Sequence, residues 1–334
     1  MITAPVEQAA PARGGQAGRV LRRLGRVGPV ITVLVLLYVL CGLKNPLFFE
    51  PTVAMGLVKR AAPLMVLAAG QALVVIVGGL DLSVGALVTM TVVLGAGLSN
   101  GNPAATWWLL PGLLLLGAVV GLINGLIVTR LKVPSFIATL GMMGILGGVV
   151  FQWSGGAPRG ALAENFRVLG RGWIDVPVVG QLPYSVLVVV VVTVLAWWWL
   201  HRSDFGQQIF AVGGNADTAE LSGVPVSRVR VLVFAASGLC AALAGVLVGG
   251  FAGVSAQVGT GMEFEAISAV VVGGAVIGGG RGSLPLAVAG ALTLELLFTL
   301  LNLFSFPEPI RDTVQGVIII AAVAYGGFRA RRTG

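Results

Sequence analysis

The sequence has few charged residues, one histidine and two cysteines. Asp, Glu, Lys and Arg make up only 10% of its 334 residues, whereas 57% are hydrophobic. A single histidine excludes a metal site built from several histidines. Cys41 and Cys240 both fall inside hydrophobic runs, so they provide neither a disulfide framework nor a metal cluster. We expect both cysteines to be small core residues.

Long hydrophobic runs dominate instead. A run of about 20 apolar residues is long enough to cross a bilayer as a helix, and the 50 glycines suit helices that pack backbone to backbone in lipid. The sequence therefore predicts an all-α polytopic membrane protein of about ten transmembrane helices. The predicted spans are 29–43, 61–78, 84–99, 107–129, 135–153, 183–200, 230–252, 264–278, 284–303 and 310–327.

The basic residues lie between these runs, which the positive-inside rule explains better than binding to nucleic acid. With both termini in the cytoplasm, 7 of the 21 Lys and Arg residues would lie outside. We therefore predict a cytoplasmic basic tail at 1–28, a transmembrane domain at 29–328 with a cytoplasmic loop at 201–229, and a cytoplasmic basic tail at 329–334. Lys59 and Arg60, both on the outer side, are expected to close a short interfacial helix over 51–60.

A polar segment, His201–Val229, separates two hydrophobic runs. Within it Asn215 can cap a helix of about two turns, Ala216–Ser222, which Gly223 and Pro225 would end. Because so short a helix is marginal in water, it needs a surface to dock on. Either the chain's own membrane domain or a partner protein can provide that surface.

Glycines interrupt the hydrophobic pattern twice, at Gly78–Gly85 (GGLDLSVG) and at Gly273–Gly282 (GGAVIGGGRG). Paired interruptions of this kind in the two halves of a transporter predict discontinuous helices that flank a pseudo-symmetric pathway. The simpler alternative is a tight turn between helices in which Asp81 or Ser83 is an N-cap.

Glu295 lies deep in a predicted span, where a charge is costly and must face the protein interior or water. It can serve transport, or it can be neutral and hydrogen-bonded to a neighbouring helix. Glu263 and Glu265 fall at a predicted helix start, where capping and the helix dipole account for them.

Enzyme motifs are missing or out of context. The pattern G-x-x-x-x-G-K-[ST] does not occur, so the chain cannot bind ATP through a P-loop. Gly97–Gly101 matches the nucleophile elbow around Ser99, but no strand precedes it and His201 is expected across the membrane. We interpret the match as chance and expect no enzymatic activity and no cofactor on this chain.

Taken in order, several segments resemble the ribose-type permease family of ABC importers. They are GGLDLSVG at Gly78–Gly85, Asn124-Gly125 followed by VPSFIATL at Val133–Leu140, VGGNA at Val212–Ala216 with LSG at Leu221–Gly223, and AVVVGG at Ala269–Gly274 with GGGRG at Gly278–Gly282. The resemblance extends from about Asn45 to the last predicted span.

This resemblance implies a permease subunit with two pseudo-symmetric halves and no ATPase of its own. A separate cytoplasmic ATPase would bind ATP and Mg, an extracytoplasmic solute-binding protein would deliver the solute, and a second copy or a paralogue would complete the pathway. The coupling residues that it implies are Gly213, Gly214, Asn215, Asp217, Ala219, Glu220, Leu221, Ser222, Gly223 and Val224. The expected translocation path includes Asp81, Ser83, Asn124, Phe136, Thr139, Glu265 and Glu295.

The substrate is left open by the sequence. Glu295 and Phe298 stand where a pentose path would be expected to have small or amide side chains, so the candidates are a monosaccharide, a polyol or a sugar-like signal such as autoinducer-2. Branched-chain amino acids and nucleosides are disfavoured. The alternative function is a proton-coupled secondary transporter that uses Glu295 together with Asp81.

Overall fold

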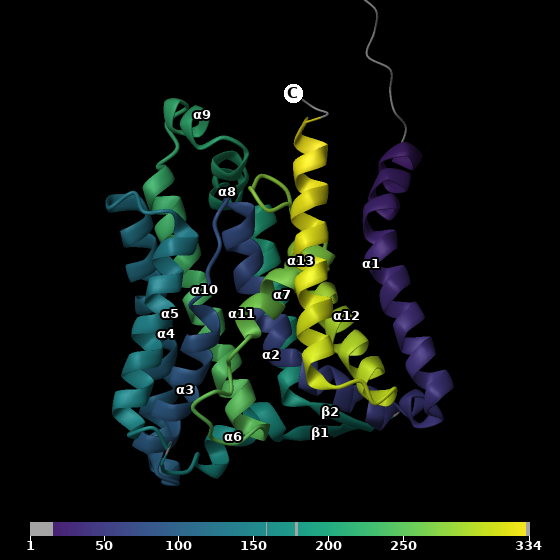
Figure 1. Cartoon of the computed structure of the whole chain (residues 1–334), viewed down its shortest axis with the longest axis vertical. Coiled ribbons are helices and arrows are strands. Elements are labelled where there is room, and N and C mark those ends of the chain that lie inside the picture. Colours follow the sequence, from purple (N-terminus) through teal and green to yellow (C-terminus); the bar gives the residue numbers. More distant parts are fainter. Residues whose placement is uncertain (1–15, 158, 178–179, 332–334) are drawn as a thin grey trace, which may run out of the picture.

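The computed structural model describes residues 16–157, 159–177 and 180–331, and these are almost entirely helical (Figure 1). The first part of the chain contains α1 (Gln16–Lys44), η1 (Pro46–Phe49), α2 (Pro51–Ile76), α3 (Val84–Ser99), η2 (Pro103–Ala105), α4 (Thr106–Arg130), α5 (Ser135–Ser154) and α6 (Glu164–Arg171). The rest contains β1 (Trp173–Val176), β2 (Gly180–Pro183), α7 (Tyr184–Arg202), α8 (Asp204–Gly214), α9 (Ala216–Leu221), α10 (Val226–Phe251), α11 (Met262–Val272), α12 (Leu284–Leu303) and α13 (Glu308–Arg331).

Six of the described helices are long and apolar enough to cross a membrane, namely α2, α4 with the η2 turn before it, α5, α7, α10 and α12. Two shorter apolar helices accompany them, α3 and the Gly28–Lys44 part of α1. These observations confirm a multi-pass, helical membrane protein. The prediction of a full span at 264–278 is wrong, because α11 has only 11 residues and so rises about 16 Å, roughly half of a bilayer core.

The predicted interfacial helix at 51–60 is also wrong, because α2 runs without interruption from Pro51 to Ile76. The two cations that suggested a boundary both have partners. Lys59 donates a hydrogen bond from Nζ to the carbonyl oxygen of Arg171 at 2.7 Å and lies 4.6 Å from the ring centre of Trp173. Arg60 pairs with Glu295 on α12. With both charges compensated, the helix has no need to bend onto the membrane surface.

Close packing of helix backbones, expected from the glycine content, is clearest between α4 and α10. Gly117, Gly121 and Gly125 lie four residues apart on one face of α4 and face α10. A Cβ atom at Gly121 would overlap the carbonyl oxygen of Phe234, and one at Gly117 would overlap that of Gly238. Such contacts give van der Waals packing that larger side chains would prevent, which is how helices associate in lipid.

The two ends of the molecule carry different elements (Figure 1). At one end, called here the α6 end, α6 and the antiparallel β1–β2 hairpin form a small cap in which Trp173 pairs with Pro183. Sequence reasoning predicted no element there. At the opposite end, called the α9 end, α8 and α9 form a polar projection, and α8 was likewise not predicted. Cys41 is fully buried and Cys240 partly buried, and both thiols are free.

Candidate functional site

The first helix break, residues 77–83, is built around the buried carboxylate of Asp81. Its Oδ1 accepts hydrogen bonds from the backbone nitrogen of Ser83 at 3.0 Å and from Ser83 Oγ at 2.7 Å. Its Oδ2 accepts from Ser237 Oγ on α10 at 3.0 Å, and Asn124 Nδ2 on α4 donates to Ser83 Oγ at 2.9 Å. The carboxylate therefore joins the break to two neighbouring helices.

Side chains of α5 and Gln71 form hydrogen bonds with the backbone groups of the same break that have no partner within a helix. The nitrogen of Leu80 donates to Ser135 Oγ at 3.1 Å, and that of Leu82 donates to Thr139 Oγ1 at 3.0 Å. The amide of Gln71, oriented to satisfy both groups, bonds the backbone N–H and C=O of Asp81 at 3.2 Å. Because an unpaired backbone group inside a membrane costs several kcal/mol, these side chains are what permit the chain to leave the helix here.

Four of the residues expected on a translocation path therefore meet at one place, namely Asp81, Ser83, Asn124 and Thr139. All four are buried, so in this chain they support the break and do not line an open cavity. Of the two N-cap candidates, Ser83 stands at the N-cap position of α3 but makes no capping hydrogen bond with its side chain, whereas Asp81 Oδ1 accepts from the backbone nitrogen of Ser83. Phe136 is different, since half of its surface is exposed on α5.

The second break, residues 273–283, separates α11 from α12, and four of its glycines have positive φ. These are Gly274 at 83°, Gly278 at 121°, Gly279 at 96° and Gly280 at 72°. Side chains other than glycine rarely adopt this backbone conformation. The sequence GGAVIGGG is thus required by the geometry of the loop, and the chain leaves the helix at both predicted interruptions.

The two breaks and the end of α8 meet in a single backbone junction. The nitrogen of Gly280 donates to the carbonyl oxygen of Ile76, the last residue of α2, at 2.8 Å. A Cβ atom at Gly213 would overlap that same oxygen, and one at Gly279 would lie 2.9 Å from the Cα of Gly78 and 2.6 Å from the oxygen of Gly213. In Figure 1 the second break is the loop beside α8. Three glycine motifs that are far apart in sequence are therefore in direct contact.

The corner that leads from α7 into α8 is held by aromatic stacking and a cap. Trp199 stacks on Phe205 with ring centres 4.8 Å apart, and Trp197 stacks on His201 at 5.6 Å. Ser203 caps α8 by accepting from the nitrogen of Gly206 at 3.1 Å. On the inner face of α8, Ile209 and Val212 are buried. Helix α8 is thus firmly attached to the membrane domain.

Helix α9 has the predicted cap and the predicted end. Asn215 Oδ1 accepts from the nitrogen of Thr218 at 2.9 Å, and Gly223 has φ +83°. Only Ala219 is buried against the chain, whereas Leu221 is 90% exposed. The remaining expected coupling residues of the tip are exposed, apart from the half-buried Val224; the exposed ones are Gly214, Asn215, Asp217, Glu220, Ser222 and Gly223.

A groove of about 440 Å³ lies beside α9, between the end of α4 and the start of α10. Arg130 and Arg228 line it together with Glu220 and Pro225. Sequence reasoning did not include these basic residues in the coupling set, although their predicted cytoplasmic position was a signal that could have suggested them.

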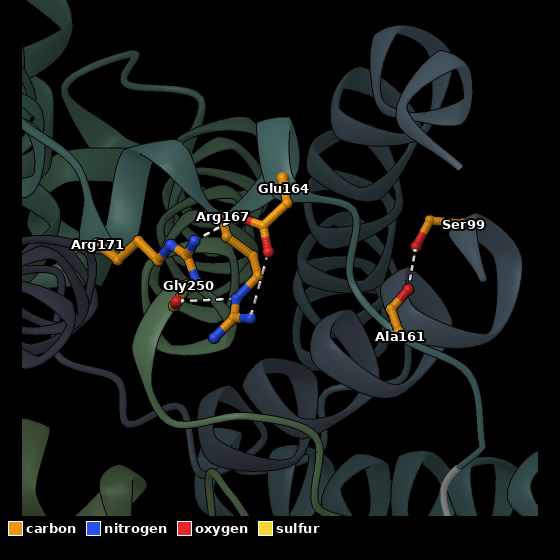
Figure 2. A network of polar contacts seen from close by, with 6 residues as sticks. All are labelled: Ser99, Ala161, Glu164, Arg167, Arg171 and Gly250. Carbon is orange, nitrogen blue, oxygen red and sulfur yellow. Dashed lines mark hydrogen bonds and ion pairs between the residues drawn. The ribbon is translucent and has the colours of Figure 1, made fainter. Parts of the chain in front are cut away.

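At the α6 end, Glu164 forms ion pairs with two arginines of its own helix, and one of these arginines also bonds the end of α10. Figure 2 shows Glu164 between Arg167 and Arg171, with Arg167 Nε donating to the carbonyl oxygen of Gly250, at the end of α10, at 3.1 Å. Ser99 Oγ donates to the oxygen of Ala161 at 2.8 Å. Ser99 therefore has a structural role at this end of the molecule, far from His201 at the end of α7, which agrees with the interpretation of the nucleophile-elbow match as chance.

Glu295 lies in a pocket of about 490 Å³ between α2, α12 and α13, lined by both polar and apolar side chains. Its Oε1 is 3.5 Å from Arg60 Nε, and its side chain is 22% exposed. Arg311 also lines the pocket. Glu265, the other glutamate expected on the path, lies on α11, which packs against α12 and α13. Sequence reasoning did not include the two arginines of the pocket in the path.

Comparison with known proteins decides the family. The family model described as "Branched-chain amino acid transport system / permease component" matches residues 53–323. The chain belongs to this permease family. Among the described residues, no group of three His, Cys, Asp or Glu side chains could hold a metal ion. No solved structure matches the permease.

Curated relatives match nearly the whole permease. It is 34% identical to the ribose import permease protein RbsC of Bacillus subtilis (strain 168), over 89% of this chain and 91% of the relative. It is 33% identical to RbsC of Escherichia coli (strain K12), over 88% and 91% of the two chains. The autoinducer 2 import system permease protein LsrC of Klebsiella pneumoniae is 34% identical over 88% and 84%.

Proposed function

We propose that this chain is the membrane-spanning permease subunit of an ABC importer for a monosaccharide or a related polyol or sugar-like solute. The observation that supports coupling to an external motor is the backbone junction, where Gly213 touches the ends of both broken helices. A force applied to the polar projection reaches the helix ends at the breaks without passing through a flexible linker.

The coupling segment, Gly213–Val224, has the features of a docking element for a partner. Its outer side carries an almost fully exposed leucine, Leu221, beside the acidic residues Asp217 and Glu220, and a groove with two arginines lies next to it. Since so short a helix needs a surface to dock on and α9 buries only Ala219 against the chain, a partner can provide the rest of that surface. The partner that we propose is a separate cytoplasmic ATPase, which would bind ATP and Mg.

The orientation follows from the distribution of charge. With α9 in the cytoplasm, both basic tails lie inside and the majority of Lys and Arg residues are cytoplasmic. The α6 end then faces outward, toward an extracytoplasmic solute-binding protein. We further propose the domain limits 1–28, 29–328 and 329–334, about ten membrane crossings or half-crossings, and two pseudo-symmetric halves, each with one broken helix.

The mechanism is alternating access driven by the ATPase. Closure of the ATPase on ATP would displace α9 and, through the rigid α7–α8 corner, push Gly213 against Ile76 and the second break. Helix α2 ends at the first break and α12 begins after the second. These two helix ends would therefore shift relative to each other and open the path toward the binding protein.

The translocation path is proposed to form between this permease and a second copy or a paralogue. Asp81, Ser83, Asn124 and Thr139 support it from inside the chain by holding the first break. Phe136, exposed on α5, Glu265 and Glu295 contribute to its surface.

The relatives favour a sugar as the substrate. Although the family description names branched-chain amino acids, the matching curated permeases import ribose and autoinducer 2. Selectivity among sugars is expected to rest mainly with the binding protein. The alternative of a proton-coupled secondary transporter lacks support, since Glu295 is paired with Arg60 and the relatives are import-system permeases.

Co-purification tests this proposal. The tagged permease should retain its cognate ATPase in mild detergent, and Leu221→Asp should release the ATPase while the permease stays in the membrane. Leu47→Asp is the matched control, because Leu47 is 54% exposed but lies at the opposite end, in η1. Equal ATPase retention by both variants would remove α9 from the interface.

A further inference from the structure

The pocket around Glu295 has the composition of a binding site for a small polar molecule. Its volume of about 490 Å³ lies within the range of small-molecule sites. Arg60 and Arg311 supply only hydrogen-bond donors, Glu295 supplies acceptors, and Thr299 and Asn302 can do both. Phe298 closes one wall, and its ring lies 4.6 Å from the Arg311 guanidinium.

The balance of charge in and around the pocket argues against an anionic ligand. The guanidinium of Arg60 faces the carboxylate of Glu295 at 3.5 Å. Arg311 lines the same pocket, and α11, which carries Glu265, packs against α12 and α13. Arg60 is therefore already paired, and a second carboxylate lies on a helix packed against the walls of the pocket. A free phosphate or an acidic lipid headgroup would be repelled by Glu295 as well as attracted by the arginines.

A neutral polyol fits the same groups. Each hydroxyl can donate to a carboxylate and accept from a guanidinium at once, so vicinal hydroxyl groups can bridge Glu295 and Arg60 without breaking the balance of charge. An aliphatic amino acid would need an apolar chamber for its side chain, whereas Phe298 and Leu303 are the two apolar residues that line the pocket.

The position of the pocket connects it to the junction. Arg60 is on α2, which ends at the first break, and Glu295 is on α12, which starts after the second. Along α2 the pocket and Ile76 are 16 residues apart, or about 24 Å. Lys59, next to Arg60, bonds the end of α6. The pocket therefore lies toward the α6 end, and its walls are the helices that meet at the junction.

We propose that this pocket is a low-affinity subsite for a neutral polyhydroxylated solute, formed by Arg60, Glu295, Thr299, Asn302 and Arg311, which the solute occupies on entry from the α6 end. The inference rests on the proposed function for the direction of entry. A relative shift of α2 and α12 at the junction would change the separation of Arg60 and Glu295 and so release the solute.

Thiol labelling tests the subsite. Thr299→Cys places a thiol in the pocket, and Thr313→Cys is the matched control, because Thr313 is exposed on α13 outside it. The full-length variants are placed in nanodiscs and treated with a maleimide at increasing concentrations of D-ribose. We expect ribose to slow labelling of the Thr299→Cys thiol several-fold and to leave the control unchanged, with the unsubstituted chain giving the background from Cys41 and Cys240.

A second variant connects protection to the charged pair. Adding Glu295→Gln to Thr299→Cys should raise the ribose concentration for half-protection about tenfold, the effect of losing one charge-assisted hydrogen bond. Labelling that ribose and sorbitol do not slow would overturn the subsite. Equal protection by L-leucine, or protection that appears only with phosphatidylglycerol in the nanodisc, would overturn its chemical class.

The two proposals fail in distinguishable ways. Uptake of ribose by the assembled importer, with its ATPase and binding protein, is measured separately from labelling. ATP-driven uptake without protection at residue 299 would refute the subsite and leave the importer function intact. Protection without ATP-driven uptake would support the subsite and contradict the importer.

Discussion

Replacing Gly213 with alanine should weaken the protein at the point where the coupling segment meets both breaks. The new methyl group would overlap the carbonyl oxygen of Ile76 and crowd the nitrogen of Gly280, which are hydrogen-bonded to each other at 2.8 Å. Overpacking of this kind costs about 1 to 3 kcal/mol, and a lost hydrogen bond adds about 0.5 to 1.5 kcal/mol. Alanine regains up to about 1 kcal/mol in a helix, so the expected loss is about 0.5 to 4.5 kcal/mol.

Gly214→Ala is the matched control, because a Cβ atom at Gly214 meets no atom of the described residues within 4 Å. Gly214→Ala should raise the free energy of unfolding slightly, by no more than about 1 kcal/mol. The assay is the apparent midpoint of thermal unfolding in one detergent, together with ATP-driven uptake per folded permease. If Gly213→Ala has the stability and the uptake of the wild type, the claim that close contact at the junction couples the two breaks is wrong.

A larger residue at Gly214 tests docking of the partner separately from the stability of the fold. Gly214→Trp should keep the unfolding midpoint near that of the wild type, since the position is exposed, but it should reduce uptake if the ATPase docks there. Normal uptake would show that the partner does not reach residue 214.

Three further predictions concern other parts of the fold. Asp81→Ala should destabilise the permease by about 2 to 4 kcal/mol, since it leaves the buried donors of the first break without an acceptor. Asp81→Asn keeps one acceptor oxygen and should keep most of the stability and the uptake. Loss of uptake in Asp81→Asn without loss of folding would instead favour a proton-carrying role for Asp81. Gly121→Ala should lower the unfolding midpoint by overpacking α4 against α10, and Gly144→Ala, which faces open space on α5, should not; equal midpoints would contradict the close packing. Glu164→Gln should change the free energy of unfolding by less than about 1 kcal/mol, because this glutamate is largely exposed. A larger loss in a thermal unfolding experiment would mean that the ion pairs of Glu164 are what chiefly hold the cap at the α6 end.

The features that sequence reasoning predicted well have strong local signals. The apolar runs gave the positions of most helices, and the Asn215 cap with Gly223 gave α9 within one residue. Both breaks were found because clustered glycines, with a charged residue in each segment, interrupt the apolar pattern. These signals depend on neighbouring residues alone, so they can be recognised without knowing the fold.

The features that were missed depend on contacts between distant residues. Hydropathy alone predicted a full span at 264–278, although the glycine interruption at Gly273–Gly282 overlaps its end, and the structure shows that α11 stops at Val272. What the sequence could not show is that Ile76 and Gly213, from other parts of the chain, hold the second break. Lys59 and Arg60 seemed to require an interfacial helix until their partners Arg171 and Glu295 were known. The meeting of three glycine motifs at the junction was likewise invisible in the sequence.

Reconstituted transport tests the central claim most directly. The permease is placed in liposomes with its ATPase and its binding protein, and uptake of the radiolabelled sugar that the binding protein retains is followed with and without ATP and with and without a pH gradient. The account predicts uptake that needs ATP and the ATPase, ignores the pH gradient, and is lost in Leu221→Asp. Uptake by the permease alone, driven by a pH gradient, would contradict it.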